Sequence, residues 1–167
     1  ENFVNNSIAT VETDIFALGM TLYRMVNNIP NWERFLQSIP NCENMIRTGK
    51  LIDKLPIDPV VPDKVYRIIK KACRKSPDDR YHSAAEMRNA IEKLCPCYSW
   101  NSVDENHWVG NGVGIPQKDI CILLKRNSID VIVTNNGRKS TKDSKKFADL
   151  FAAKAYLMDY IRQTTLK

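Results

Sequence analysis

The 167 residues, 43% of them hydrophobic, suffice for one domain or two small ones. No run of about 18 apolar residues occurs and the first residues lack the basic and apolar regions of a secretory signal, so neither a membrane partner nor export is expected. The formal net charge is +6, of which residues 1–97 supply +2 (14 basic, 12 acidic) and residues 98–167 supply +4 (11 basic, 7 acidic), an excess that favours contact with nucleic acid or acidic protein.

The first half of the chain has the periodicity of helices. Asp14–Asn27 is apolar on nearly every side, which predicts a helix in the centre of the protein. Either Thr13 or Asp14 is a suitable cap for its start. A shorter helix is expected over Glu33–Ser38, and the three prolines within Gly49–Pro62 predict a loop.

Two further helices are predicted before residue 95. Asp63–Lys75 has an apolar stripe with lysines outside it, and Ser76–Asp79 ends the pattern. Ser83 is expected to cap a last helix that runs to Leu94, with Glu86 completing a capping box. The residues expected on the buried face of that helix are Ala84, Met87, Ala90, Ile91 and Leu94.

After a proline-containing connector, Cys95–Ser102, the pattern changes to that of strands. Asp119–Lys125 and Ile129–Thr134 are short, rich in β-branched residues and bounded by turn residues. Asn127-Ser128 lies between them as a two-residue hairpin turn, and Asn136-Gly137, which tolerates positive φ, marks the next bend. This half is therefore expected to contain a small sheet.

A third strand is expected over Trp108–Val113, and a closing helix over Ser144–Gln163. The fold class predicted is α+β, with a helical domain over residues 1–97 and a small sheet-plus-helix domain over residues 98–167. The side chains expected to point inward from the closing helix are Phe147, Leu150, Phe151, Leu157, Met158 and Ile161.

Two segments of the first half carry a family resemblance. Thr13–Met25, TDIFALGMTLYRM, has an Asp-x-x-x-x-Gly spacing and is followed by Asn28-Ile29-Pro30; Val65–Met87 reads VYRIIKKACRKSPDDRYHSAAEM. The first resembles the buried central helix of a eukaryotic-type Ser/Thr protein kinase. The second is similar to the penultimate helix, the loop after it and the Arg that precedes the final helix. Their order and spacing match the C-terminal part of such a kinase over residues 1–94.

The resemblance implies roles for four residues. Asp14 matches the Asp that accepts hydrogen bonds from the backbone of the catalytic loop, and Gly19 allows close packing of the central helix. Arg80 matches the Arg that pairs with the Glu at the end of the activation segment, and Glu1 stands at about the right interval to be that Glu. Two plainer interpretations stay open at this stage: Asp14 as a helix cap and Arg80 as a surface charge.

The motifs of kinase chemistry are not in their family positions. A Gly-rich loop, a strand Lys, a catalytic Asp and Asn, and an Asp-Phe-Gly all precede the central helix in the family, and only 13 residues precede Asp14. Gly110, Gly112 and Gly114 lack the required spacing and are interpreted as a turn. The segment that ends at Lys125 is only weakly similar to the strand that carries the kinase Lys. ATP, magnesium and catalysis are therefore expected only of an intact parent kinase, not of this chain.

An all-round apolar helix without its usual neighbours needs another cover. Several hundred Å² of apolar surface would otherwise face water, and this exposure costs a free energy of about 25 cal/mol for each Å². The expected partner is the remainder of the kinase domain or a second copy of the chain, besides a protein substrate or regulator.

The second half contains a basic turn, Arg138, Lys139, Lys142, Lys145 and Lys146. One interpretation is a contact surface for nucleic-acid phosphate, although stacking aromatic residues are not obvious on the strands. The other is a solvated loop of a domain that docks or regulates the kinase, and we prefer it.

The cysteines indicate neither a disulfide framework nor a metal site. Five is an odd number, and Cys95-Pro96-Cys97 is too short for the usual zinc spacing. His82 and His107 stand alone. Reduced thiols in a cytoplasmic protein are expected.

The sequence thus predicts the C-terminal part of a Ser/Thr protein kinase with a C-terminal docking or regulatory domain. The alternatives are a non-catalytic scaffold derived from a kinase and a nucleic-acid-binding module in the basic domain.

Overall fold

The computed structural model describes residues 10–167, so Glu1 and its predicted pairing lie outside the described residues. The chain divides into two compact units, Glu1–Leu94 and Cys95–Lys167, each with buried apolar residues of its own. Helices dominate the first unit and an antiparallel sheet the second, which confirms the predicted α+β class. Within residues 10–167, no helix combines the length and apolarity needed to span a bilayer.

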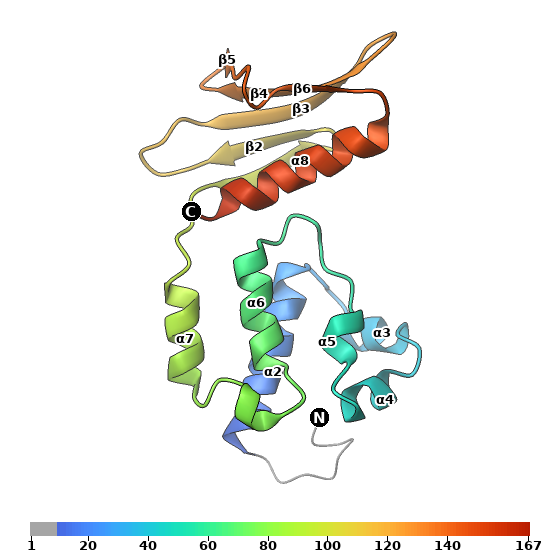
Figure 1. Ribbon diagram of the computed structural model, residues 1–167, viewed down its shortest axis with the longest axis vertical. Helices are drawn as coiled ribbons and strands as arrows, with labels where there is room; N and C mark the ends of the chain where they lie inside the picture. Colours follow the sequence, from blue (N-terminus) through green and yellow to red (C-terminus); the bar gives the residue numbers. More distant parts are fainter. Residues whose placement is uncertain (1–9) are drawn as a thin grey trace. The chain divides into compact units, whose positions relative to one another are not determined.

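The first unit is helical throughout its described part (Figure 1). Its elements are α2 (Val11–Val26), α3 (Trp32–Gln37), α4 (Cys42–Arg47), α5 (Leu51–Lys54), α6 (Asp63–Ala72), the 3₁₀ turn η1 (Pro77–Asp79) and α7 (Ala84–Glu92).

Helix α2 begins earlier than predicted, with Thr10 as its N-cap. The Thr10 hydroxyl accepts a hydrogen bond from the backbone N–H of Thr13 at 3.4 Å, and the Thr13 hydroxyl accepts one from the N–H of Thr10 at 2.9 Å. These reciprocal bonds satisfy two backbone donors that the first turn leaves free. The prediction that Thr13 or Asp14 is the cap is therefore wrong, because both residues lie inside the first turn.

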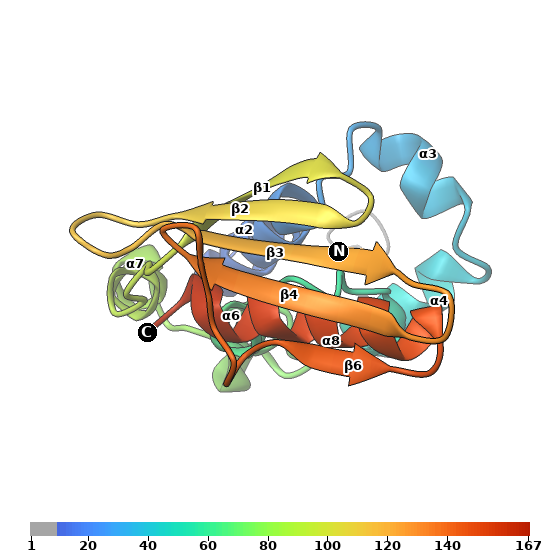
Figure 2. The same ribbon diagram turned by 90° about the horizontal axis from the view of Figure 1, so that it is seen from above.

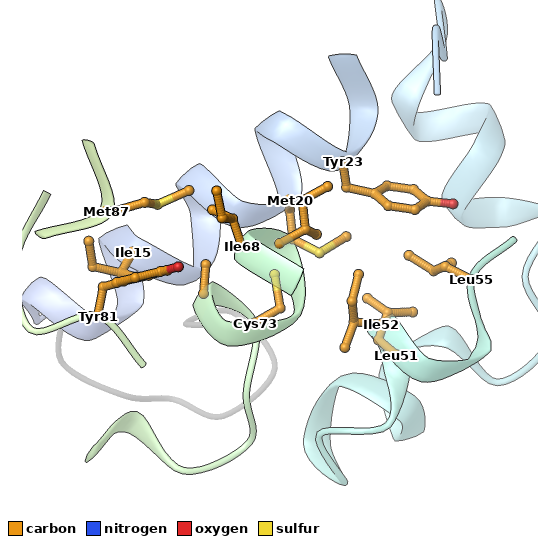
Figure 3. Packing of buried hydrophobic residues seen from close by; sticks show 12 residues of the cluster. Ile15, Met20, Tyr23, Leu51, Ile52, Leu55, Ile68, Cys73, Tyr81 and Met87 are labelled. Atoms are coloured by element: carbon orange, nitrogen blue, oxygen red, sulfur yellow. The ribbon is translucent and has the colours of Figure 1, made fainter. Parts of the chain in front are cut away.

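The core of this unit forms where α2 packs against α6 and the segments around them (Figure 3). Gly19 is buried at the crossing, and a Cβ added there would lie 2.6 Å from the Cys73 sulfur. Tyr23 is fully buried and donates its hydroxyl to the backbone oxygen of Pro56; burial raises the pKa of Tyr23 to about 12. The buried apolar residues are Ile15, Met20, Tyr23, Leu51, Ile52, Leu55, Ile68, Ile69, Ala72, Cys73, Tyr81 and Met87.

Two predictions for this unit need correction. The segment Gly49–Pro62 is not wholly a loop, because α5 forms within it after the unpredicted α4, and its Leu51 and Ile52 supply core side chains. The expected inner face of α7 is buried only at Met87, and Ile91 is 39% exposed.

The second unit is a sheet of six strands with one helix, all within residues 95–167 (Figure 2). The strands are β1 (Ser99–Asp104), β2 (His107–Asn111), β3 (Lys118–Leu124), β4 (Ile129–Asn135), β5 (Arg138–Lys139) and β6 (Lys145–Phe147), and the helix is α8 (Leu150–Thr165). Strands β1 to β4 form an antiparallel meander, and β5 and β6 both pair with β4.

Three strands of this sheet were not predicted. β1 begins halfway along the segment expected to be a connector, and β5 and β6 share the outer edge of β4. Between these two short strands, the Ser144 hydroxyl accepts a hydrogen bond from the N–H of Val133 at 3.0 Å. A side chain therefore replaces a missing ladder bond and keeps the edge of β4 satisfied.

Helix α8 covers one face of the sheet and is shorter at its start than predicted. Asp149 is its N-cap and accepts a hydrogen bond from the N–H of Ala152 at 2.8 Å. Leu157 and Ile161 are buried as expected, against sheet residues that include the directly opposed pair Ile120 and Val133. The helical placement of Phe147 is wrong, because it lies on β6, and the expected burial of Leu150 and Phe151 is also wrong, because both are exposed.

Candidate functional site

Arg80 is the most deeply buried charged side chain of the described residues, 1% exposed. Its Nε donates to the backbone oxygen of Arg74 at 2.7 Å, and its Nη1 donates to that of Glu12 in the first turn of α2 at 2.8 Å. The guanidinium also lies 5.0 Å from the ring centroid of Phe16, close enough for a cation–π contact. Arg80 thus joins the segment after α6 to the start of α2, and its interpretation as a surface charge is wrong.

The other kinase-like positions lie along the same helix. Gly19 is buried where α2 crosses α6, whereas Asp14 is exposed and makes no side-chain hydrogen bond within residues 10–167. Asp14 is not the helix cap either, so neither plainer interpretation of these residues holds. The kinase roles of Asp14 and Arg80 stay predictions, because they involve a catalytic loop and a Glu1 that lie outside residues 10–167; Gly19 does allow a close approach of α2 to Cys73.

An open apolar groove runs between α2 and α7. Its volume is about 310 Å³, and its rim includes Leu18, 44% exposed, and Met25, 71% exposed. Because these residues recur every seven positions with Val11, which is also exposed, they form one stripe along α2. The residues that line the groove are Leu18, Thr21, Leu22, Met25, Ala84, Met87, Arg88 and Ile91.

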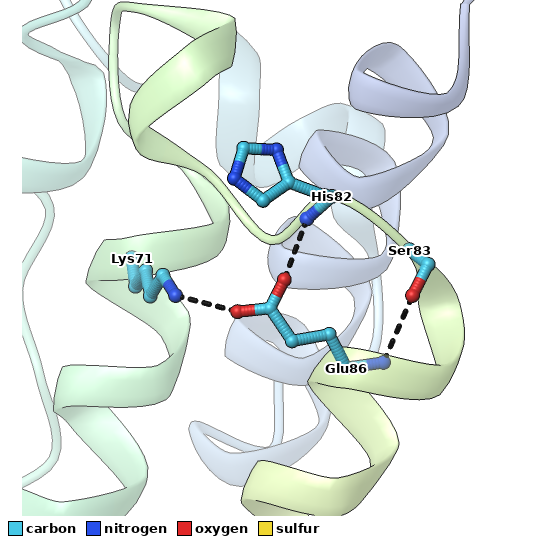
Figure 4. A network of polar contacts seen from close by, with 4 residues as sticks. All are labelled: Lys71, His82, Ser83 and Glu86. Carbon is cyan, nitrogen blue, oxygen red and sulfur yellow. Dashed lines mark hydrogen bonds and ion pairs between the residues drawn. The ribbon is translucent and has the colours of Figure 1, made fainter.

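A polar network fixes α6 to the start of α7 (Figure 4). Glu86 accepts hydrogen bonds from Lys71 Nζ and from the backbone N–H of His82, both at 2.8 Å, and Ser83 caps the helix as predicted. The Lys71 hydrogen bond holds the pKa of Glu86 below its usual value. The expected capping box is wrong in one detail, because Glu86 reaches His82 rather than Ser83. The Lys71 partnership was missed, since a loop separates the two helices in sequence.

The basic turn of the second unit lies beside a small hollow. Lys139, Lys145 and Lys146 line a hollow of about 150 Å³, but Arg138 and Lys142 do not. Lys145 Nζ lies 4.6 Å from the ring centroid of Tyr156, on the side of the sheet that α8 covers.

The same hollow contains a buried acidic side chain, Asp130, 3% exposed. Lys125 Nζ lies 2.6 Å from its carboxylate, and this hydrogen bond lowers the pKa of Asp130. Because a carboxylate already occupies the hollow, its lysines are partly neutralised. Trp100 lies against Tyr160 of α8, so this ring is not available on the open face to stack bases.

A cysteine, a histidine and an aspartate meet on the open face of the sheet. Cys121 lies opposite His107 in the β2–β3 register, and His107 Nε2 lies 3.5 Å from Asp119. Burial, followed by the negative charge of Asp119, raises the pKa of the Cys121 thiol. The thiolate needed of a nucleophile is therefore disfavoured. Among residues 10–167, no three or more His, Cys, Asp or Glu side chains, these included, are placed so that they could hold a metal ion together.

Comparison with known proteins gives one partial similarity. Over 81 residues, 48% of the chain, it is 33% identical to the peroxide stress-activated histidine kinase mak3 of Schizosaccharomyces pombe. The matched segment is 3% of that protein. No protein-family model and no solved structure matches the chain. The similarity indicates relatedness to a part of a protein named as a kinase. Because it covers only this part, it shows neither which residue type would accept the phosphoryl group nor which lobe of a kinase domain the chain would match.

Proposed function

We propose that residues 1–97 are the C-terminal part of the catalytic domain of a Ser/Thr protein kinase and that residues 98–167 are a docking or regulatory domain attached to it. The intact parent, in the cytoplasm, would transfer the γ-phosphoryl group of ATP, with magnesium, to hydroxyl groups of proteins. The chain alone would not be catalytic.

The placement of Arg80 carries this proposal. A buried guanidinium costs free energy unless its donors are satisfied, and here it bonds to backbone oxygens of Glu12 and Arg74. The kinase resemblance expects an Arg at this position, after the penultimate helix and beside the end of the activation segment. A buried Arg that bonds to the start of the helix matching the kinase central helix supports that assignment.

The groove between α2 and α7 supports the assignment of residues 1–97 to part of a catalytic domain, because further kinase residues would cover it. In the family, the central helix packs on the catalytic loop and the helix before it, and both precede the matched segments in chain order. The exposed stripe with Leu18 and Met25 would then be an internal surface of the parent.

The coding sequence upstream of Glu1 tests the proposal most directly. A His-Arg-Asp followed by an Asp-Phe-Gly within one reading frame is expected, and the corresponding longer protein should phosphorylate serine or threonine in a generic acceptor protein. A start codon close to Glu1 would instead favour a non-catalytic scaffold derived from a kinase.

The apolar groove has a separate test in the chain itself. Size-exclusion chromatography with light scattering should show dimers or larger species, and Leu18→Glu with Met25→Glu should shift them to monomer. Val103→Glu with Val113→Glu is the matched control, because both valines are exposed outside the groove. A wild-type chain that stays monomeric at high micromolar concentration would contradict the claim that the groove between α2 and α7 is an internal surface that other protein covers.

A further inference from the structure

A second hollow in the first unit is strongly basic and lies outside the α2–α7 groove. Its volume is about 610 Å³, and it forms between the Gly49 turn, α5 and the last turns of α6. The residues that line it are Gly49, Ile52, Asp53, Arg67, Lys70, Lys71, Cys73, Arg74 and Lys75.

The cations of this hollow outnumber its carboxylates. Lys70 Nζ pairs with Asp53 at 2.6 Å, and Lys71 Nζ pairs with Glu86 at 2.8 Å. The side chains of Arg67, Arg74 and Lys75 are exposed and have no carboxylate partner within residues 10–167. Arg67 lies on α6, Arg74 and Lys75 follow its end at Ala72, and all three line the same hollow. Three like charges held together repel one another unless an anion joins them.

The backbone around these charges is fixed by buried contacts. The Arg80 guanidinium bonds to the backbone oxygens of Arg74, at 2.7 Å, and of Lys75, at 3.4 Å. On the opposite wall, Gly49 has a φ of +64°, and a Cβ added there would lie 2.3 Å from the Cβ of Lys75. The turn therefore closes directly on Lys75, and the backbone that carries Arg74 and Lys75 is positioned before any ligand binds.

We propose that this hollow is a docking site for an acidic peptide segment of a protein partner, whose carboxylates pair with Arg67, Arg74 and Lys75. Charge complementarity identifies the chemistry of the partner. Single-stranded nucleic acid is a poorer fit, because no aromatic ring lines the hollow to stack a base. A flat bilayer surface is a poorer fit as well, because the cations line a concavity. The proposal does not depend on the kinase assignment.

Fluorescence anisotropy of the 167-residue chain with labelled octaglutamate tests the site, and octaglutamine serves as the neutral probe. Octaglutamate is expected to bind at low ionic strength and to weaken as salt is added. The variant Arg67→Gln, Arg74→Gln, Lys75→Gln should bind it about tenfold or more weakly, since each exposed pair contributes modestly.

The matched control is Arg34→Gln, Arg88→Gln, Arg126→Gln, which has the same net charge but leaves the hollow intact. It should bind octaglutamate about as tightly as the unmodified chain. Equal weakening of both variants would overturn the proposal, because net charge alone would explain it. So would the absence of octaglutamate binding at low salt, or tighter binding of oligothymidylate or of phosphatidylserine vesicles that the hollow variant alone loses.

Discussion

Replacing Arg80 with methionine should destabilise the first unit more than any surface substitution. Methionine keeps an unbranched stem but removes the donors to the backbone oxygens of Glu12 (2.8 Å), Arg74 (2.7 Å) and Lys75 (3.4 Å). Hydrogen bonds from a charged donor contribute about 1.5–3 kcal/mol each, and the stranded carbonyl groups add a desolvation penalty. Because the third bond is long, we expect a total loss of about 3–5 kcal/mol in the free energy of unfolding.

The assay has to report on the first unit alone, because a chain of two units need not unfold in one step. Hydrogen exchange measured by mass spectrometry on peptides from α2 and α6 does so, and peptides from α8 provide an internal reference. The control, Arg74→Met, removes an exposed charge two residues beyond the end of α6 and should change stability by about 0.5 kcal/mol or less. If the two variants protect α2 equally well, the bonds of Arg80 do not hold α2 in place, and the main support for the kinase assignment is lost.

Two further substitutions have expected outcomes. Gly19→Ala should lower the free energy of unfolding of the first unit by about 1–3 kcal/mol, and its urea midpoint with it, because the added Cβ would lie 2.6 Å from the Cys73 sulfur. Alanine normally stabilises a helix interior, so an unchanged midpoint would contradict this packing. Asp130→Asn should remove a contribution to stability that depends on pH. The hydrogen bond from Lys125 lowers the pKa of Asp130 in the folded state. The carboxylate therefore stabilises the fold above its unfolded pKa of about 4, and this stabilisation is lost as the pH falls through the lower pKa of the folded state. The difference in thermal midpoint between wild type and this variant should therefore shrink from pH 7 towards pH 2, and a difference independent of pH would refute it.

Strong periodicity is what made parts of this fold predictable. The apolar residues of α2 and α6 and the β-branched runs of β3 and β4 place those elements to within a few residues of their observed bounds. Asn136-Gly137 also forms the predicted bend, with φ values of 46° and 76°. In each case, the local sequence and the tertiary packing favour the same structure.

The wrong predictions fall on segments where the local sequence favours one structure and the tertiary packing another. β1 is an edge strand, mostly exposed, so it lacks the apolar alternation that marks a strand. Phe147 continues the helical spacing of α8 in sequence, but the cap at Asp149 and pairing with β4 put it in β6. Long-range pairs left no local signal at all: Arg80 meets the backbone of Glu12 across 68 residues.

The exposed stripe of α2 also bears on what would cover it in the proposed parent kinase. Val11, Leu18 and Met25 are 53%, 44% and 71% exposed, and full burial of such a side chain is worth about 1.5–3 kcal/mol, so covering the stripe recovers roughly 3–5 kcal/mol. Association of two separate molecules costs an estimated 4–15 kcal/mol before any contact is counted. A symmetric dimer buries the stripe on both molecules and so offsets that cost in part, which is why the dimer of the isolated chain is sought at high micromolar concentration. A segment of the same polypeptide avoids most of the cost, so the energetics of this groove favour a cover made by continuous chain, as in an intact kinase domain, over a separately made partner.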